Sequence, residues 1–135
     1  YGVGWHAYLP VERIRAEFLP NDELPAAYAS AGVVLNDHWP DMAAEGFLSN
    51  RLFDAAATGA RIVSDPAVGL GDVFGDAVRT YRTPGELCAI LGGDPADAFP
   101  DRATRLELAS RIAQEHSFAA RALELIAQVE QARRS

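Results

Sequence analysis

The sequence contains no lysine, and all twelve of its basic side chains are arginine. Nineteen acidic residues give a formal net charge of −7 at pH 7. A surface with this excess of negative charge matches nucleic acid and anionic membranes poorly, so we predict that neither is a partner. Because lysine is absent, an anionic ligand must be held by arginine or by backbone N–H groups.

Residues suited to metals and disulfides are also scarce. Cys88 is the single cysteine, which excludes an internal disulfide and favours a reducing, cytoplasmic compartment. The three histidines, His6, His38 and His116, lie far apart and lack the spacing of a metal-ligand set. We therefore predict no metal and no cofactor. No apolar run approaches the roughly 18 residues that span a bilayer, so no transmembrane segment is expected.

The 135 residues suffice for one domain that buries roughly two-thirds of its unfolded surface. Residues 1–5, YGVGW, look like the second half of a strand ended by glycines, and no initiator methionine precedes them. We interpret residues 1–135 as a single domain, and as the C-terminal fragment of a longer protein.

The most informative stretch is residues 45–65, EGFLSNRLFDAAATGARIVSD. Its apolar residues recur at i, i+4, i+7 and i+8, which predicts a helix over 47–58 with one face against a sheet. Gly59 stands where a helix usually ends in a left-handed residue. Residues 61–64 then predict a short buried strand. A loop, helix, glycine and strand in this order are typical of a parallel α/β sheet, whose ligands lie beyond the carboxyl ends of the strands.

Other segments extend this pattern to about five strands. The remaining strands are predicted at residues 1–5, 11–18, 33–36 and 77–81, with 33–36 fully buried and 77–81 at an edge. Helices are predicted after an Asp22 N-cap with Pro25 in the first turn, after a Thr83 cap with Pro84 in the first position, and over 102–115 and 118–132 with Ser117 capping the last. Residues 37–45 and 92–100 are predicted to be loops.

An anion site is predicted at the start of helix 47–58. Gly46 would let the backbone approach a ligand, and the N–H groups of Phe47, Leu48 and Ser49 would point at an anion. No Ser, Thr, Asp or Asn occupies positions 43–48, so these groups should be unpaired within the protein. The alternative is that Gly46 is an ordinary turn residue.

Three side chains are further candidates for substrate binding. Asp54, on the polar face of the helix, has a carboxylate that accepts two hydrogen bonds from a ribose. Alternatively, Asp54 and Arg51 form an ordinary surface ion pair. His38 suits an acid–base role or a sugar contact, or else it is a packing residue.

Four segments resemble a known family. They are LPAAYASA at residues 24–31, VVLN at 33–36, NRLFDAAATGA at 50–60 and IVSD at 62–65. They look like the C-terminal domain of group 1 glycosyltransferases of the two-Rossmann-domain (GT-B) type, closest to the spore-maturation-like branch with its R-x-F-E-A-x-A-x-G helix. The resemblance covers nearly the whole chain. It implies a Rossmann-like domain, one half of a GT-B fold, that binds a nucleoside diphosphate-sugar donor without a metal.

The resemblance also implies residue roles. Asp54 matches the second acidic residue of the family's Glu-x7-Glu motif, which binds the ribose, and the segment from Gly46 to Leu48 matches the one that holds the diphosphate. The first Glu of the motif would fall at position 46, which is glycine, and Glu45 lies one residue earlier. The acceptor domain and the catalytic base would precede Tyr1, so the chain alone is expected to transfer no sugar.

Two other functions remain open. A sugar-nucleotide epimerase shares the architecture, and a degenerate Rossmann-like domain serves as a non-catalytic assembly module. A receiver-like signalling domain is disfavoured because such a domain needs a lysine. A second Rossmann domain before Tyr1 would favour the enzyme over the module.

Overall fold

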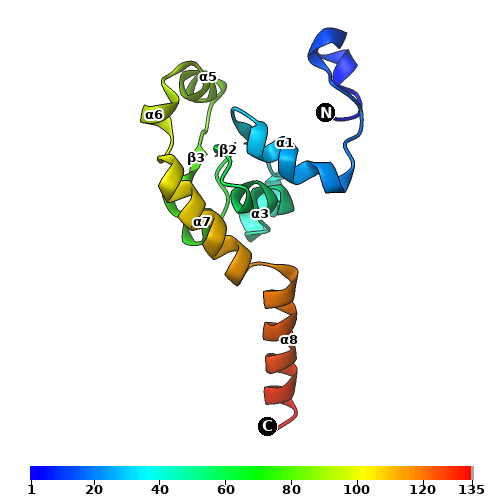
Figure 1. Cartoon of the computed structure of the whole chain (residues 1–135), viewed down its shortest axis with the longest axis vertical. Coiled ribbons are helices and arrows are strands. Elements are labelled where there is room, and N and C mark those ends of the chain that lie inside the picture. The colour runs from blue at the N-terminus through cyan, green and yellow to red at the C-terminus, as the bar shows by residue number, and fades with distance from the viewer. Residues whose placement is uncertain (135) are drawn as a thin grey trace.

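A small parallel sheet lies at the centre of the computed structural model, which describes residues 1–134 (Figure 1). Its three strands are β1 (Val34–Asn36), β2 (Ile62–Ser64) and β3 (Val78–Thr80), and they lie side by side in that order. Both pairs are parallel and in register, so that Asn36, Ser64 and Thr80 end their strands together. The α/β class and the parallel sheet are therefore confirmed.

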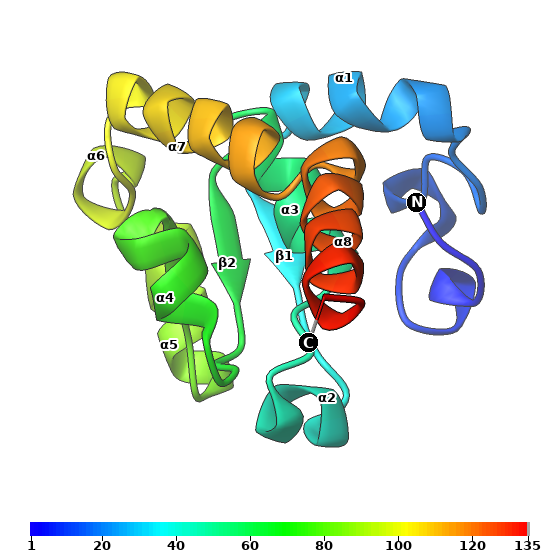
Figure 2. The same cartoon turned by 90° about the horizontal axis from the view of Figure 1, so that it is seen from below.

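Helices make the crossovers that parallel strands require. From β1 the chain passes through α2 (Pro40–Glu45) and α3 (Asn50–Ala57) to reach β2. From β2 it passes through α4 (Leu70–Phe74) and a 3-10 turn, η4 (Gly75–Ala77), to β3. Figure 2 shows α2 beyond the arrowhead of β1, on the carboxyl side of the sheet.

The predicted apolar face of α3 forms the middle of the core. Leu52, Ala55 and Ala56 are buried, and Leu48 packs against them from the preceding loop. The helix ends at Gly59, whose φ of 71° confirms the predicted left-handed residue. A Cβ there would also lie 3.2 Å from a methyl carbon of Leu106, so both backbone conformation and packing require glycine.

Two of the five predicted strands are wrong, because residues 1–134 contain three strands. Residues 1–5 and 11–18 instead contain the 3-10 turns η1 (Trp5–Ala7) and η2 (Val11–Arg13). Gly2 and Gly4 have φ values of 136° and 83°, which bend the backbone out of an extended conformation. The apolar side chains of this segment remain exposed, so no burial stabilises a strand.

The next helix and the edges of the sheet also differ in detail from expectation. Asp22 lies within η3 (Asn21–Glu23) and does not cap α1 (Leu24–Ser30), although Pro25 does occupy its first turn. β3 is an edge strand, as predicted. β1 is the other edge, and Leu35 is 51% exposed, so the prediction of a fully buried strand is wrong.

The two segments predicted as loops each contain a short helix. Residues 37–45 contain α2, which begins at Pro40, and residues 92–100 contain α6 (Pro95–Ala98). In both helices the proline lies in the first turn, where its missing N–H has no cost. In these two segments proline therefore marks the beginning of a helix and does not indicate a loop.

The helix predictions in the C-terminal half are confirmed. Thr83 caps α5 (Pro84–Gly92), and Ser117 caps α8 (Phe118–Ala132) by accepting a hydrogen bond from the Ala120 N–H at 3.2 Å. α7 (Arg102–Glu115) buries Ala109 and Ile112 against the core. α8 extends away from the sheet and buries no residue (Figure 1). Among residues 1–134 no helix has both the length and the apolar character to cross a membrane.

Arg105 ties α7 to the turn before β2. Its Nε donates to the Gly59 carbonyl at 2.9 Å, and its Nη1 donates to the Pro100 carbonyl at 2.6 Å. Burial, followed by the nearby charges of Arg61 and Arg102, lowers the pKa of this guanidinium. The side chain therefore joins segments 46 residues apart in the sequence.

We expect Arg105→Ala to lower the free energy of unfolding by about 1–3 kcal/mol, because two carbonyls lose a charged donor. Chemical denaturation measures the change. Arg102→Ala removes an exposed arginine one turn earlier on α7 and should change stability by less than about 0.5 kcal/mol. Equal losses in the two variants would contradict the assignment of a structural role to Arg105.

Candidate functional site

His38 lies at the carboxyl side of the sheet with both ring nitrogens bonded. Nδ1 lies 2.6 Å from Oδ1 of Asp65, and Nε2 accepts the backbone N–H of Ser49 at 3.2 Å. The His38 side chain is fully buried, whereas that of Asp65 is 25% exposed. Because the Ser49 N–H needs an acceptor, Nε2 carries the lone pair and Nδ1 carries the proton. In this arrangement the imidazole is neutral and donates to Asp65.

The same carboxylate ends a second chain of hydrogen bonds. The Asn36 amide donates to the Ser64 hydroxyl at 3.0 Å, and that hydroxyl donates to Oδ1 of Asp65 at 3.2 Å. The His38 backbone N–H adds a bond to Oδ2 at 3.3 Å. Asp65 thus accepts from Ser64 on β2 and from His38 in the loop after β1, and Asn36 on β1 reaches it through the Ser64 hydroxyl. Sequence reasoning overlooked this residue, although its position directly after a buried strand was a usable signal.

The register of the sheet sets three polar side chains in a row. Asp37, Asp65 and Tyr81 each follow the last residue of their strand, and the Tyr81 N–H continues the ladder by donating to the Ser64 carbonyl at 3.1 Å. Burial raises the pKa of the Tyr81 phenol, and the negative charges of Asp65 and Asp37 raise it further. This edge of the sheet therefore has a negative potential, which suits hydroxyl groups better than phosphate.

The prediction of three unpaired N–H groups is wrong. Each group has an acceptor within the protein: Phe47 donates to the Met42 carbonyl at 2.9 Å, Leu48 to the Gly46 carbonyl at 3.1 Å, and Ser49 to His38 Nε2. The prediction failed because α3 begins at Asn50 and not at Phe47. The segment before it is a loop that pairs its own backbone.

Ser49 is the N-cap of α3, and its hydroxyl accepts the Arg51 N–H at 3.3 Å. The N–H of Asn50, between them, has no acceptor among residues 1–134. One donor at this helix end therefore remains open to a ligand, and it belongs to the residue directly after the three donors that were predicted.

Gly46 has an ordinary structural reason to be glycine. It ends α2 with a φ of 73°, and a Cβ at this position would lie 3.3 Å from the carbonyl oxygen of Val68. The Val68 N–H in turn donates to the Ala43 carbonyl at 3.0 Å, so α2 and the loop after β2 are in direct contact. Close approach of a ligand to Gly46 remains a prediction.

The charged candidates lie on exposed surface. Arg51 and Asp54 are both exposed on α3, and no ion pair joins them within residues 1–134. The alternative prediction of a surface ion pair between Arg51 and Asp54 is therefore wrong. Glu45 is exposed at the end of α2. Within residues 1–134 these three side chains form no ion pair with one another, while a hydrogen bond joins His38 to Ser49.

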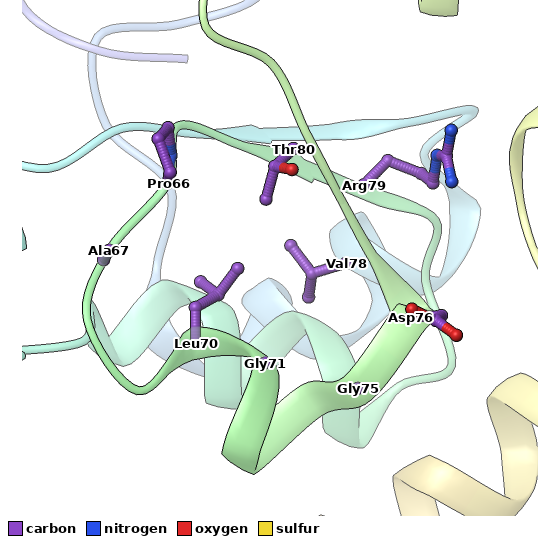
Figure 3. A pocket seen from close by; sticks show the side chains of 9 residues that line it. All are labelled: Pro66, Ala67, Leu70, Gly71, Gly75, Asp76, Val78, Arg79 and Thr80. Atoms are coloured by element: carbon purple, nitrogen blue, oxygen red, sulfur yellow. The ribbon is translucent and has the colours of Figure 1, made fainter.

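Two hollows lie elsewhere on the molecule. One of about 340 Å³ lies between α4 and β3, with Leu70 and Val78 inside and Asp76 and Arg79 at one side (Figure 3). Another of about 370 Å³ lies in the angle between α7 and α8, and its lining includes His116 and Arg121. Neither is lined by a predicted substrate-binding residue.

Metal chemistry has no evident centre in the part of the chain that the structure describes. No three His, Cys, Asp or Glu side chains among residues 1–134 converge as they would around an ion. Cys88 is free and exposed on α5. The end of the sheet instead offers carboxylates and a phenol, and the start of α3 offers one open backbone N–H.

Comparison with known proteins identifies the family. The family model described as glycosyl transferase-like matches residues 1–127 of the 135. No curated protein and no solved structure gives a significant match. Because the family model covers nearly the whole sequence and agrees with the α/β fold, this chain belongs to the glycosyl transferase-like family.

Proposed function

We propose that this chain is the donor-binding domain of a glycosyltransferase that moves a sugar from a nucleoside diphosphate-sugar to an acceptor. In this proposal it is one half of a GT-B fold, related to the spore-maturation-like branch. The family match supports a glycosyltransferase domain. The observation that carries donor binding is the open end of α3, where the free N–H of Asn50 lies beside the exposed side chains of Arg51 and Asp54.

The diphosphate is proposed to bind at this helix end. α3 has eight residues, so its dipole favours an anion near Asn50 by about 0.3–1 kcal/mol when exposed. The Arg51 guanidinium adds a full positive charge in a chain that has no lysine. Together the N–H group and the arginine would stabilise the charge that develops on the leaving diphosphate.

The ribose and the sugar are proposed to lie on either side of the diphosphate. Asp54 is exposed one turn into α3, and no cation among residues 1–134 forms an ion pair with it, so its carboxylate is free to accept two hydrogen bonds from ribose hydroxyls. Glu45, Gly46, Phe47 and Leu48 form the segment before α3 and are proposed to contact the sugar and the phosphates. The negative sheet edge favours the neutral sugar, whose hydroxyls donate to carboxylates.

The first test is a thermal-shift panel of UDP, GDP, ADP and CDP. We expect at least one to raise the melting temperature, since a ligand at 100 times its Kd stabilises a protein by about 2.7 kcal/mol. The matching nucleoside, which lacks the diphosphate, should stabilise the protein less. If no nucleoside diphosphate shifts the transition, the non-catalytic assembly module becomes the better reading.

The second test concerns Asp54. We expect Asp54→Asn to weaken binding of the stabilising nucleotide by roughly tenfold to a hundredfold, which corresponds to about 1.5–3 kcal/mol for a hydrogen bond to a charged acceptor. The melting temperature without ligand should stay nearly constant, because Asp54 is exposed and no salt bridge involves it. Asp97→Asn on α6 is the matched control. Unchanged affinity in Asp54→Asn would remove Asp54 from the site.

The third test separates phosphate contacts from ribose contacts. We expect Arg51→Gln to reduce the affinity for the nucleoside diphosphate while leaving that for the nucleoside unchanged, because only the former carries the anion that a guanidinium binds. Isothermal titration with both ligands measures the difference. Arg79→Gln, an exposed arginine on β3, is the control. A parallel loss for both ligands would place Arg51 elsewhere than at the phosphates.

A further inference from the structure

His38 joins the end of β2 to the start of α3 through its ring. Its Nδ1 donates to Asp65 after β2, and its Nε2 accepts from Ser49, the N-cap of α3. The ring therefore fixes the distance between the end of the central strand and the first residue of the helix. Both bonds exist together only when Nδ1 carries a proton and Nε2 does not.

We propose that His38 is a positioning residue that holds the start of α3 only while its imidazole is neutral, so that this helix end is released when the ring takes up a proton. The released element is the Ser49 N-cap together with the loop of residues 46–49. A weaker affinity for the donor follows only if the proposed function is right. Loss of the hydrogen bond between the Ser49 N–H and His38 Nε2 does not depend on that function.

The chemistry of the step follows from the lone pair on Nε2. A proton added there comes from solvent and uses the lone pair that accepts the Ser49 N–H. Two N–H groups would then face each other across a separation that is now 3.2 Å, and their like-signed hydrogens repel. The bond to Ser49 is lost, whereas the bond from Nδ1 to Asp65 becomes an ion pair. After protonation the ring therefore keeps its bond to Asp65, after β2, and loses its bond to Ser49, before α3.

The surroundings of His38 contain one charged partner. Among residues 1–134, Asp65 is the side chain that both an ion-pair distance and a hydrogen bond join to the ring. Asp37 follows β1 and Tyr81 follows β3, and the negative charges of Asp65 and Asp37 both help to raise the pKa of the Tyr81 phenol. On α2, Asp41 and Glu45 are exposed, and on α3, Arg51 is exposed. Among residues 1–134 His38 is the one basic side chain that forms an ion pair with Asp65.

Release of Ser49 would disturb the next residues of α3. Ser49 caps the helix through its hydroxyl, and Asn50, which follows it, has the open N–H. A cap that moves carries this N–H with it. We expect the affinity for a nucleoside diphosphate to fall by about threefold to tenfold once the imidazole is protonated, as for loss of one ordinary hydrogen bond.

The experiment is a pH titration of the 15N-labelled protein by NMR. The His38 ring nitrogens report the tautomer and the protonation of the imidazole, and the Ser49 amide reports the bond to Nε2. We expect the Nδ1–H tautomer at high pH, and an upfield shift and faster hydrogen exchange of the Ser49 amide that follow the His38 titration. His38→Gln retains an acceptor without a titrating group, so its Ser49 amide should not respond to pH.

His116→Gln is the matched control. His116 packs on Phe53 with ring centroids 5.4 Å apart and is not joined to Ser49, so this variant should keep the wild-type response of the Ser49 amide. The proposal is overturned by a Ser49 amide that ignores His38 protonation, by a response that persists in His38→Gln, or by an imidazole that is protonated only on global unfolding. If His38→Gln does not fold, the wild-type titration alone decides between these outcomes.

A second readout separates this proposal from the proposed function. UDP, GDP, ADP and CDP are titrated into the protein on both sides of the His38 transition. Weaker binding on the acidic side supports both proposals. A Ser49 amide that follows His38 while no nucleotide binds at any pH supports the positioning role and contradicts donor binding. Nucleotide binding with no change across the transition overturns the positioning role alone.

Discussion

Burial of β2 on all sides is the constraint from which the rest of the structure follows. Ile62, Val63 and Ser64 are all buried, since β1 and β3 pair with both edges of the strand and helices cover its faces. A central parallel strand has no access to water, so each polar group on it must find a partner within the protein. Ser64 is the polar residue in question, and its hydroxyl cannot remain unbonded without a cost of about 1–3 kcal/mol.

Asp65 resolves that constraint at the carboxyl end of the sheet. As the first residue beyond β2 it keeps partial contact with solvent, which lets it remain a carboxylate and accept from Ser64 and His38. Asn36 reaches the same carboxylate through Ser64. The Asn36 amide nitrogen and the Ser64 hydroxyl are thus paired through one acceptor, whereas Oδ1 of Asn36 is buried without a partner among residues 1–134. The ring of His38 extends the pairing to Ser49 at the start of α3. Satisfying a buried strand therefore also sets where the helix begins.

Much of this fold was predictable because its signals are local. The stripe on α3, the left-handed Gly59, and the caps Thr83 and Ser117 each depend on residues within a turn or two of one another. The strand predictions at residues 1–5 and 11–18 were wrong because strand pairing depends on residues far away in the sequence. A strand needs a partner at its edge, and residue composition alone does not reveal whether that edge is available.

The candidate site was less predictable because its geometry is set by long-range contacts. The bond between His38 and Asp65 spans 27 residues, and that between Ser49 and His38 decides that α3 begins three residues later than its apolar periodicity indicated. The residue types Asp54, Arg51 and Gly46 could be singled out from spacing. The pairing of the N–H groups of Phe47, Leu48 and Ser49 could not, because each acceptor is fixed by the folded loop.

Charge distribution then limits how a donor can be oriented in the proposed complex. Asp37 and Asp65 make the end of the sheet negative, and the chain as a whole has a net charge of −7. A diphosphate placed over that row would face two carboxylates, whereas at the start of α3 it meets the Asn50 N–H, the helix dipole and Arg51. In the proposed complex the phosphates would therefore lie at the helix and the hydroxyl-rich sugar at the strand ends. His38 joins these two regions through its bonds to Asp65 and Ser49, so in the proposed complex its ring would set the separation between the phosphate contacts and the sugar contacts.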